Sequence, residues 1–126
     1  MVGMHALIIE DNLDSIDILG RLLTKAGVTS AAVSQPTQLQ EVHLANVDVV
    51  FLDLDMPGMD GYDVYDLLRN EYGMTVPIIA YTVHTNEKAT ARRMGFNGMV
   101  AKPVDPVCFR DQLQRILQGE SMWDDC

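Results

Sequence analysis

The sequence predicts a single α/β domain built on a mainly parallel five-stranded sheet. Two kinds of hydrophobic pattern alternate along the 126 residues, and this alternation carries the prediction. Short apolar runs rich in β-branched residues mark strands that are buried on both faces, as the strands of a parallel sheet are. Stretches with apolar residues at helical spacing separate these runs. A composition that is 48% hydrophobic gives a chain of this length enough apolar surface for one core.

Five strands are expected, four of them from strong apolar runs and one from a weaker run. The strong runs span residues 6–9, 47–52, 76–81 and 98–101, and the weaker run spans residues 28–33. A helical stretch follows each strand, so the chain contains five β-α pairs. Repeated β-α pairs predict a parallel sheet that is covered by helices on its faces.

The helices are recognised from their apolar stripes and from their capping residues. The first is expected over residues 13–26, with Asn12 as its N-cap and Gly27 as its stop. Its apolar stripe consists of Ile16, Leu19, Leu23 and Ala26. Further helices are predicted over residues 36–45, 61–71, 86–94 and 106–118. In the last of these, Asp105 is the expected cap and Pro106 occupies the first helical position.

The domain is expected to occupy residues 1–119, followed by a short C-terminal tail over residues 120–126. Trp123 could pack on the domain or on a partner, but the prediction is a frayed tail. Two cysteines, Cys108 and Cys126, make no disulfide framework, and the first ten residues lack a basic leader region. No apolar stretch approaches the roughly 20 residues that cross a bilayer. We therefore expect a cytoplasmic protein without a membrane partner.

Negative charge is concentrated in the first half of the chain. The net charge is −9, and residues 1–63 hold 10 of the 18 acidic residues but only 2 of the 9 basic ones. An acidic surface repels phosphate backbones, so direct binding to nucleic acid is not expected. The first half is therefore where a cation site is sought.

Polar side chains follow four of the five predicted strands. They are Glu10, Asp11, Asp53, Asp55, Thr82 and Lys102. The carboxyl ends of parallel strands form the functional crevice of an α/β sheet, so these side chains should meet there. Clustered carboxylates without histidine or cysteine suit a hard cation such as Mg²⁺. A carboxylate beside a metal, a hydroxyl and a lysine can act as the nucleophile in phosphoryl transfer.

Each of these residues also has an ordinary structural explanation. Asp11 alone could be a helix cap, Thr82 could bond to the backbone at a strand end, and Lys102 could be a solvated lysine. Their joint placement at the ends of four strands is what favours a shared site.

Four segments of the chain, in this order and spacing, carry a family resemblance. They are residues 7–12 (Leu-Ile-Ile-Glu-Asp-Asn), 50–61 (Val-Phe-Leu-Asp-Leu-Asp-Met-Pro-Gly-Met-Asp-Gly), 77–82 (Pro-Ile-Ile-Ala-Tyr-Thr) and 101–103 (Ala-Lys-Pro). Over essentially its whole length the chain resembles a two-component response-regulator receiver domain of the chemotaxis-regulator type. The resemblance implies a (βα)₅ flavodoxin-like, doubly wound parallel sheet with strand order 2-1-3-4-5.

The resemblance also implies a role for each acidic residue. Asp53 would be the phosphoacceptor, taking a phosphoryl group from a phosphohistidine on a sensor histidine kinase or a histidine phosphotransfer protein. Asp11 and Asp53 would ligate Mg²⁺ directly, Glu10 would do so through water, and Asp55 would offer its backbone carbonyl. Mn²⁺ could take the place of Mg²⁺.

The remaining implied roles concern the switch and its readout. Thr82 would hydrogen-bond a phosphoryl oxygen, and Lys102 would pair with the phosphate and precede a cis bond to Pro103. The signal would leave through the face formed by the fourth helix, fifth strand and fifth helix, toward a downstream protein that the sequence does not identify. The protein would thus be a self-modifying switch and not an enzyme with a turnover substrate.

Three residues near the site depart from the receiver pattern or extend it. Val83 stands where receivers usually carry a small residue, so we expect slower loss of the phosphoryl group than in a Val83→Ala variant. Met99 replaces a Tyr or Phe that moves with the threonine in many receivers, which would weaken or replace that coupling. His84 could contact the phosphate or the attacking water, although a solvated loop position is expected.

Two other functions are compatible with parts of the pattern. Val83 and Met99 would suit a receiver-fold interaction module that works without phosphorylation. The Asp53-Leu-Asp55 sequence also resembles the nucleophile-and-acid pair of haloacid-dehalogenase-type phosphatases, but in those enzymes the pair lies on the first motif strand, whereas here Glu10 and Asp11 precede it.

Overall fold

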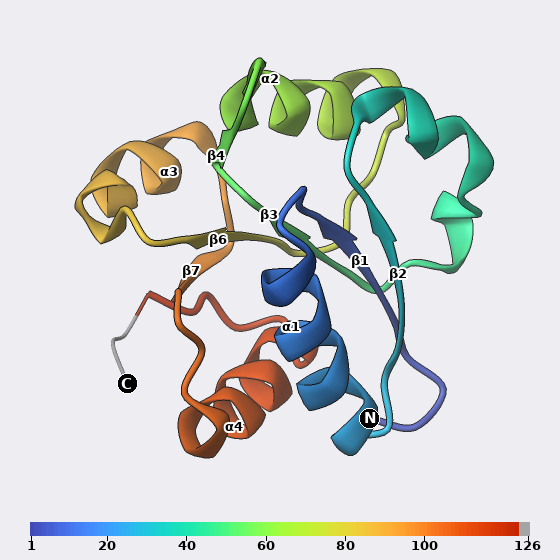
Figure 1. Ribbon diagram of the computed structural model, residues 1–126, viewed down its shortest axis with the longest axis vertical. Helices are drawn as coiled ribbons and strands as arrows, with labels where there is room; N and C mark the ends of the chain where they lie inside the picture. The colour runs from blue at the N-terminus through green and yellow to red at the C-terminus, as the bar shows by residue number, and fades with distance from the viewer. Residues whose placement is uncertain (124–126) are drawn as a thin grey trace.

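The computed structural model describes residues 1–123 and contains one central sheet of five parallel strands (Figure 1). In sheet order the strands are β2 (Thr29–Val33), β1 (His5–Ile9), β3 (Val49–Leu52), β6 (Ile78–Thr82) and β7 (Gly98–Ala101). Each strand pairs in parallel with its neighbours. The order corresponds to 2-1-3-4-5 when the sheet strands alone are counted, so the predicted flavodoxin-like fold is confirmed.

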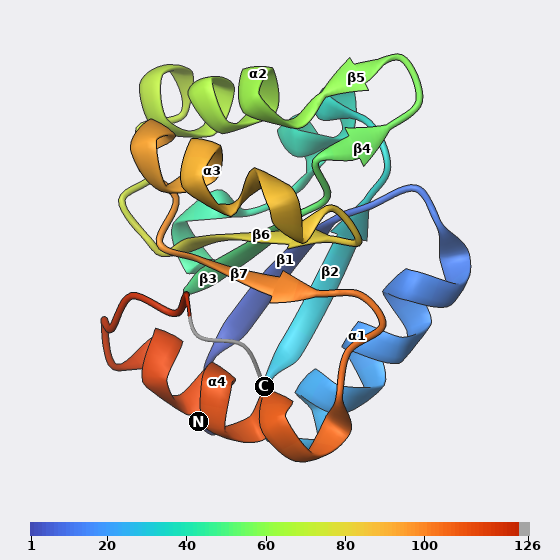
Figure 2. The same cartoon turned by 90° about the vertical axis from the view of Figure 1, so that its left-hand side faces the viewer.

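Helices cover both faces of the sheet. Helices α1 (Leu13–Lys25) and α4 (Pro106–Leu117) lie on one face, and α2 (Gly61–Asp66) and α3 (Lys88–Met94) lie on the other (Figures 1 and 2). Helix α2 runs on into one π-helical segment, η3 (Leu67–Glu71). A small hairpin precedes α2, formed by β4 (Asp55–Met56) and β5 (Met59–Asp60).

The alternation of side chains along the strands divides the core into two clusters. One lies beneath α1 and α4 and includes Ile8, Leu19, Phe51, Phe109 and Leu113. The other lies beneath α2 and α3 and includes Leu7, Leu52, Leu68, Ala80 and Phe96. Strand residues alternate between the two faces, so β1, β3, β6 and β7 each contribute to both clusters, which explains their unbroken apolar runs. Edge strand β2 contributes only Val33 to the core, which fits its weaker apolar run.

The predicted helix signals act as expected at α1 and α4. The side chain of Asn12 accepts a hydrogen bond from the backbone nitrogen of Ser15 at 2.9 Å. Asp105 accepts in the same way from Val107 at 2.9 Å, and Pro106 is the first residue of α4. These caps satisfy backbone donors that the first helical turn leaves unpaired.

The helix predicted over residues 36–45 is absent, and this part of the prediction is wrong. Two short 3₁₀ helices, η1 (Pro36–Glu41) and η2 (Leu44–Asn46), take its place. Leu39 is the only buried residue in the two turns, so the segment lacks the repeated apolar stripe that holds a full helix on a sheet. A similar turn, η4 (Thr85–Glu87), begins the segment predicted as the fourth helix, before α3.

The segment after α4 packs on the domain instead of fraying. Met122 forms a parallel bridge with Gly98 and is buried, as is Trp123. The prediction of a frayed tail is therefore wrong for residues 120–123, whereas residues 124–126 lie outside the described residues. The boundary between residues 1–119 and 120–126 stays a prediction.

Two further findings concern cysteine and membranes. Cys108, in α4, is disulfide-bonded, which the sequence reading did not expect; Cys126 lies outside the described residues. Within residues 1–123, every helix is too short or too polar to cross a bilayer.

Candidate functional site

The strand register brings the predicted site residues to one edge of the sheet. Ile9 on β1 pairs with Leu52 on β3, so Glu10 and Asp53 leave their strands side by side. The backbone nitrogen of Asp53 donates to the carbonyl oxygen of Ile9 at 2.9 Å, which extends the pairing by one residue. On the other side, the nitrogen of Lys102 donates to the carbonyl of Thr82 at 2.9 Å.

Three carboxylates form a compact acidic cluster at this edge. Glu10, Asp11 and Asp53 each offer an oxygen, and these atoms all lie within 4.8 Å of one another. Glu10 and Asp53 are buried, while Asp11 is exposed. Burial raises the pKa of the Glu10 carboxyl; the hydrogen bond from Lys102 opposes this, and the charge of Asp53 adds to it. Burial and the charge of Asp53 therefore oppose ionisation of Glu10, while Lys102 favours it.

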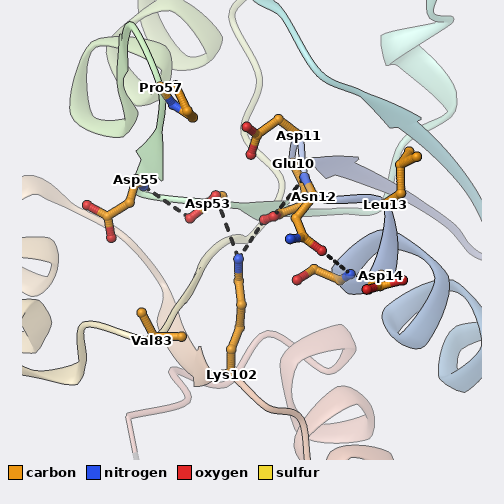
Figure 3. Close-up of a pocket in the computed structure, with 11 residues that line it drawn as sticks. Glu10, Asp11, Asn12, Leu13, Asp14, Asp53, Asp55, Pro57, Val83 and Lys102 are labelled. Carbon is orange, nitrogen blue, oxygen red and sulfur yellow. Dashed lines mark hydrogen bonds and ion pairs between the residues drawn. The ribbon is translucent and has the colours of Figure 1, made fainter.

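Lys102 reaches into the cluster from the end of β7 (Figure 3). Its Nζ donates to Oε2 of Glu10 at 2.7 Å and lies 3.6 Å from Oδ2 of Asp53. The same ammonium lies 4.7 Å from the centroid of the Tyr81 ring. The ring supplies a cation–π contact that helps to hold the lysine in a largely buried position.

Tyr81 is a site residue that sequence reasoning missed. Its hydroxyl donates to the carbonyl oxygen of Ser15 at 3.1 Å, which ties β6 to α1. Burial, reinforced by the charge of Glu10, raises the pKa of Tyr81 to about 12. The available signal was its position directly before Thr82 on a strand next to the one that carries Lys102.

A second group of contacts links Asp55, Thr82 and His84. The hydroxyl of Thr82 donates to Oδ2 of Asp55 at 3.3 Å, and Nε2 of His84 lies 3.2 Å from the same oxygen. The backbone nitrogen of His84 donates to the Thr82 hydroxyl at 3.0 Å. His84 is thus exposed but bonded to Asp55, a contact that was not expected from the sequence. The two residues stand two positions after Asp53 and Thr82, which was the available signal.

A cavity of about 740 Å³ opens above the cluster. The acidic residues and Lys102 line its floor, and Leu13, Pro57 and Val83 contribute apolar walls. The Val83 side chain is 60% exposed and faces this space across Lys102 (Figure 3). The cavity is thus lined by both Asp53 and Lys102.

The backbone around Asp53 is held on both sides. The amide of Asp55 donates to Oδ1 of Asp53 at 3.0 Å. A side-chain carbon placed on Gly61 would lie 2.7 Å from Cα of Leu54 and 3.0 Å from the carbonyl oxygen of Asp53. Glycine at position 61 therefore lets α2 begin directly against the chain that carries the carboxylate.

Two residues of the predicted switch region complete the picture. The Lys102–Pro103 peptide bond is cis. Met99 lies away from the cavity, buried in the core cluster under α3. Its backbone nitrogen donates to the carbonyl of Met122 at 2.9 Å.

The sheet order and the acidic edge place the protein among the flavodoxin-like, doubly wound α/β domains. Within this class, the family model for the response regulator receiver domain matches residues 6–114. The chain therefore belongs to the response-regulator receiver domain family.

Individual relatives agree with this assignment. Sensory transduction protein RegX3 of Mycobacterium tuberculosis is 38% identical over 77% of this chain and 43% of the relative. Probable histidine kinase 2 of Oryza sativa subsp. japonica is 32% identical over 94% of this chain but only 13% of the kinase. The chain thus spans less than half the length of these two curated relatives. A solved structure of a putative response regulator from Chloroflexus aurantiacus matches with a TM-score of 0.80 at 25% identity, covering 91% of this chain and 98% of that one.

The family assignment decides between the functions left open by the sequence. The protein is a receiver domain of two-component phosphorelay signalling. Receiver domains are signalling domains and generally not conventional enzymes. The comparisons do not favour a module that works without phosphorylation, and the family assignment leaves no support for a haloacid-dehalogenase-type phosphatase.

Proposed function

We propose that Asp53 is the phosphoacceptor of this receiver domain. The observation that carries the proposal is the position of its carboxylate: buried at the floor of the cavity, 3.6 Å from the ammonium of Lys102 and within 4.8 Å of two further acidic side chains. A nucleophilic carboxylate next to a fixed cation is what phosphoryl transfer requires.

The transfer exchanges one phosphorus bond for another. A carboxylate oxygen of Asp53 attacks the phosphorus of a phosphohistidine, an O–P bond forms, and the N–P bond breaks as the imidazole leaves with its electron pair. The phosphoryl group is lost by hydrolysis. Water attacks the phosphorus, which releases inorganic phosphate and restores the Asp53 carboxylate. Lys102 stabilises the charge on the phosphoryl oxygens in both steps.

The donor set at the cavity floor suits Mg²⁺, and Mn²⁺ would use the same oxygens. The carboxylates of Asp11 and Asp53 and the backbone carbonyl of Asp55 would hold the ion, with Glu10 acting through water. When bound, the ion neutralises charge on the transferring phosphoryl group. Oε2 of Glu10 already forms an ion pair with Nζ of Lys102 at 2.7 Å. This ion pair fits a role in which Glu10 contacts the metal ion through a water molecule.

Thr82 is the proposed sensor of the phosphoryl group. Its hydroxyl is fully buried and donates to Asp55, so it must turn away from that carboxylate to bond a phosphoryl oxygen. The shift would break one hydrogen bond and pull on the loop of Val83 and His84, because the His84 amide also bonds to the hydroxyl. Met99 lies on β7, and Pro103 lies in the turn that follows this strand. We expect both segments to follow the movement of the Thr82 loop.

The proposed partners are proteins at both ends of the relay. A sensor histidine kinase or a histidine phosphotransfer protein donates the phosphoryl group, and a downstream protein binds the face formed by α3, β7 and α4. The net charge of −9 argues against direct contact with nucleic acid. Phosphorylation is stoichiometric and has no turnover substrate. The cytoplasmic location expected from the sequence stays a prediction.

Intact-mass spectrometry tests the proposal. The protein is incubated with Mg²⁺ and acetyl phosphate, alongside Asp53→Asn and a matched Asp111→Asn variant on the exposed side of α4. We expect one phosphoryl adduct on the wild type and on Asp111→Asn, and none on Asp53→Asn or in a chelated sample. An adduct that survives in Asp53→Asn would refute the assignment, and continuous release of phosphate from a generic ester would favour the phosphatase.

A further inference from the structure

Strand β2 is the edge of the sheet at the opposite end from β7 (Figure 1). The amide of Thr29 donates to the carbonyl of Met4 at 3.1 Å, on the side of β1. Because the backbone groups of a strand point to alternate sides from one residue to the next, residues 29, 31 and 33 bond toward β1. The amides and carbonyls of Ser30 and Ala32 therefore point outward, where no strand of residues 1–123 pairs with them.

The side chains of β2 leave this outer edge unprotected. The strand reads Thr-Ser-Ala-Ala-Val and contains neither a charged residue nor a proline. Thr29, Ser30 and Ala32 are all exposed. Edge strands usually carry a lysine, a proline or a bulge that opposes the addition of a further strand. The outer edge of β2 is therefore open to another extended chain.

A groove of about 410 Å³ flanks the edge on the side of α1. Its apolar and small lining residues are Ile8, Ile16, Gly20 and Ala32. A side-chain carbon placed on Gly20 would lie 3.8 Å from Oγ of Ser30, so the absence of a side chain there keeps the groove open. Asp17 and Arg21 line the same groove and pair with each other at 2.9 Å. Since these two charges balance each other, the groove suits an uncharged, apolar side chain.

A second groove, of about 390 Å³, flanks the edge on the opposite face of the sheet. Its lining residues come from β1, from β2 and from the 3₁₀ segment that replaces the expected helix: His5, Ala31, Glu41, Val42, His43 and Asn46. Glu41 is exposed and supplies the only carboxylate of this lining, and it has no ion pair within residues 1–123. An unpaired carboxylate beside the apolar side chains of Ala31 and Val42 suits the aliphatic stem and the charged end of a lysine or arginine.

The two grooves lie where successive side chains of an added strand would point. Side chains of an extended segment alternate between the faces of a sheet, so one segment bonded to Ser30 and Ala32 would enter both grooves. The charge of the chain favours a basic segment, because residues 1–63 hold 10 of the 18 acidic residues and only 2 of the 9 basic ones. A second copy of the chain would instead bring two acidic halves together.

We propose that the outer edge of β2 is a docking site for an extended segment of a partner protein in which apolar and basic residues alternate. An apolar side chain would fill the groove beside α1, and a lysine or arginine would pair with Glu41. Adding a strand to a sheet edge is a general mode of peptide recognition, in which the backbone supplies affinity and the pockets supply specificity. The site lies at the opposite sheet edge from the face of α3, β7 and α4, and it does not depend on phosphorylation at Asp53.

The test measures the binding of a labelled peptide, Ser-Val-Lys-Val-Lys-Val-Ser-amide, to the full chain by fluorescence anisotropy at low salt. A second peptide, with glutamate in place of both lysines, tests the charge preference. Hydrogen exchange followed by NMR locates the bound peptide, because the amides of Ser30 and Ala32 should gain protection. The amide of Thr29 should be protected with or without peptide, since it is already bonded to Met4.

Two pairs of variants test the two grooves. Glu41→Gln removes the carboxylate of one groove, and its matched control, Asp111→Asn, removes one negative charge from the exposed side of α4. Gly20→Leu fills the groove beside α1 and favours the helix, since glycine is a poor helix former. Its matched control, Gly20→Ala, adds one carbon at an ordinary contact distance.

We expect the lysine peptide to bind the wild type about tenfold more tightly than the glutamate peptide. Glu41→Gln should weaken binding of the lysine peptide about threefold, as the loss of one exposed ion pair does. Gly20→Leu should weaken it about tenfold, because a valine side chain can no longer be buried there. Both control variants should bind as the wild type does. If Gly20→Leu does not fold, the Glu41→Gln pair and the exchange data decide.

Four results would overturn the proposal. The first is no binding of the lysine peptide at about 1 mM. The second is binding without protection of the Ser30 and Ala32 amides, and the third is an equal loss of affinity in Glu41→Gln and Asp111→Asn, which would indicate unspecific attraction by charge. The fourth is protection of the same two amides that rises with protein concentration in the absence of peptide, which would assign the edge to a second copy of this chain.

Discussion

The amino ends and the carboxyl ends of strands β6 and β7 lie in very different ionic environments. At their amino ends, Arg69 donates to the carbonyls of Met74 and Val76 at 2.9 and 2.7 Å and to the side-chain oxygen of Asn97 at 2.8 Å. At their carboxyl ends, Lys102 faces the acidic cluster of Glu10, Asp11 and Asp53. The Arg69 guanidinium is surrounded by neutral acceptors, whereas the Lys102 ammonium faces a cluster of three carboxylates.

The difference separates a structural end of the sheet from a functional one. The planar guanidinium of Arg69 is matched by several acceptors at once, and its stack with Tyr65 at 5.3 Å adds a further contact. At the other end the carboxylates are brought together by folding and repel one another. A bound cation, or removal of the charge at Asp53, would reduce this repulsion.

The largest expected effect comes from a substitution at the amino ends of β6 and β7. Arg69→Met would leave the carbonyls of Met74 and Val76 without their donor, and we expect the free energy of unfolding to fall by about 3 kcal/mol. Urea denaturation measures this loss. The exposed Arg93→Met on α3 is the matched control, with an expected change within about 0.5 kcal/mol. Equal stabilities of the two variants would contradict the structural role.

The next effect has the opposite sign and concerns the carboxyl end. Asp53→Asn removes one charge from the cluster while keeping an acceptor for the Asp55 amide, so the free energy of unfolding in chelator should rise by about 1 kcal/mol. Mg²⁺ should then stabilise the wild type more than the variant, because ion binding to the folded state adds to its stability. A destabilised Asp53→Asn protein would show that the cluster is already balanced by Lys102.

A smaller effect appears as a pH dependence. Burial is the main cause that raises the pKa of Glu10 above 4.5 in the folded protein. The hydrogen bond from Lys102 opposes this shift. The folded state therefore holds this proton more tightly than the unfolded chain, and the resulting stability is present below pH 4.5 and lost as the pH rises through the folded-state pKa. In chelator, the wild type should lose stability relative to Glu10→Gln over that window. Parallel curves for the two proteins would contradict the shift.

The smallest expected effect is kinetic. Val83 covers one side of the cavity, so Val83→Ala should open a path for water and shorten the phosphoprotein lifetime about threefold, equivalent to about 0.6 kcal/mol in the barrier. Phosphate release after removal of the donor measures the lifetime. The substitution should leave urea stability unchanged, since Val83 is largely exposed. Equal lifetimes would remove Val83 from the hydrolysis path.

The site was more predictable than some of the elements around it. Glu10, Asp53, Thr82 and Lys102 follow apolar strands directly, and parallel pairing alone brings strand ends together. The segment over residues 36–45 has no such constraint, since its polar surface accommodates 3₁₀ turns as readily as a helix.

Contacts made between distant loops were beyond the sequence. The approach of His84 to Asp55 depends on side-chain rotamers, and the docking of Trp123 depends on the room at Gly98, which no periodicity encodes. A lone tryptophan after a helix reads as a tail unless the edge strand that receives it is already known.

The register that pairs Ile9 with Leu52 and Thr82 with Ala101 also determines when the site is complete during synthesis of the chain. Glu10 and Lys102 are separated by 92 positions in sequence, yet their charged atoms lie 2.7 Å apart. A chain emerging from the ribosome has its acidic residues early and acquires the lysine only when the fifth sheet strand has been made. If Asp53 is the phosphoacceptor, as proposed, an incomplete or misregistered copy lacks the lysine at the site, and we expect it not to be phosphorylated.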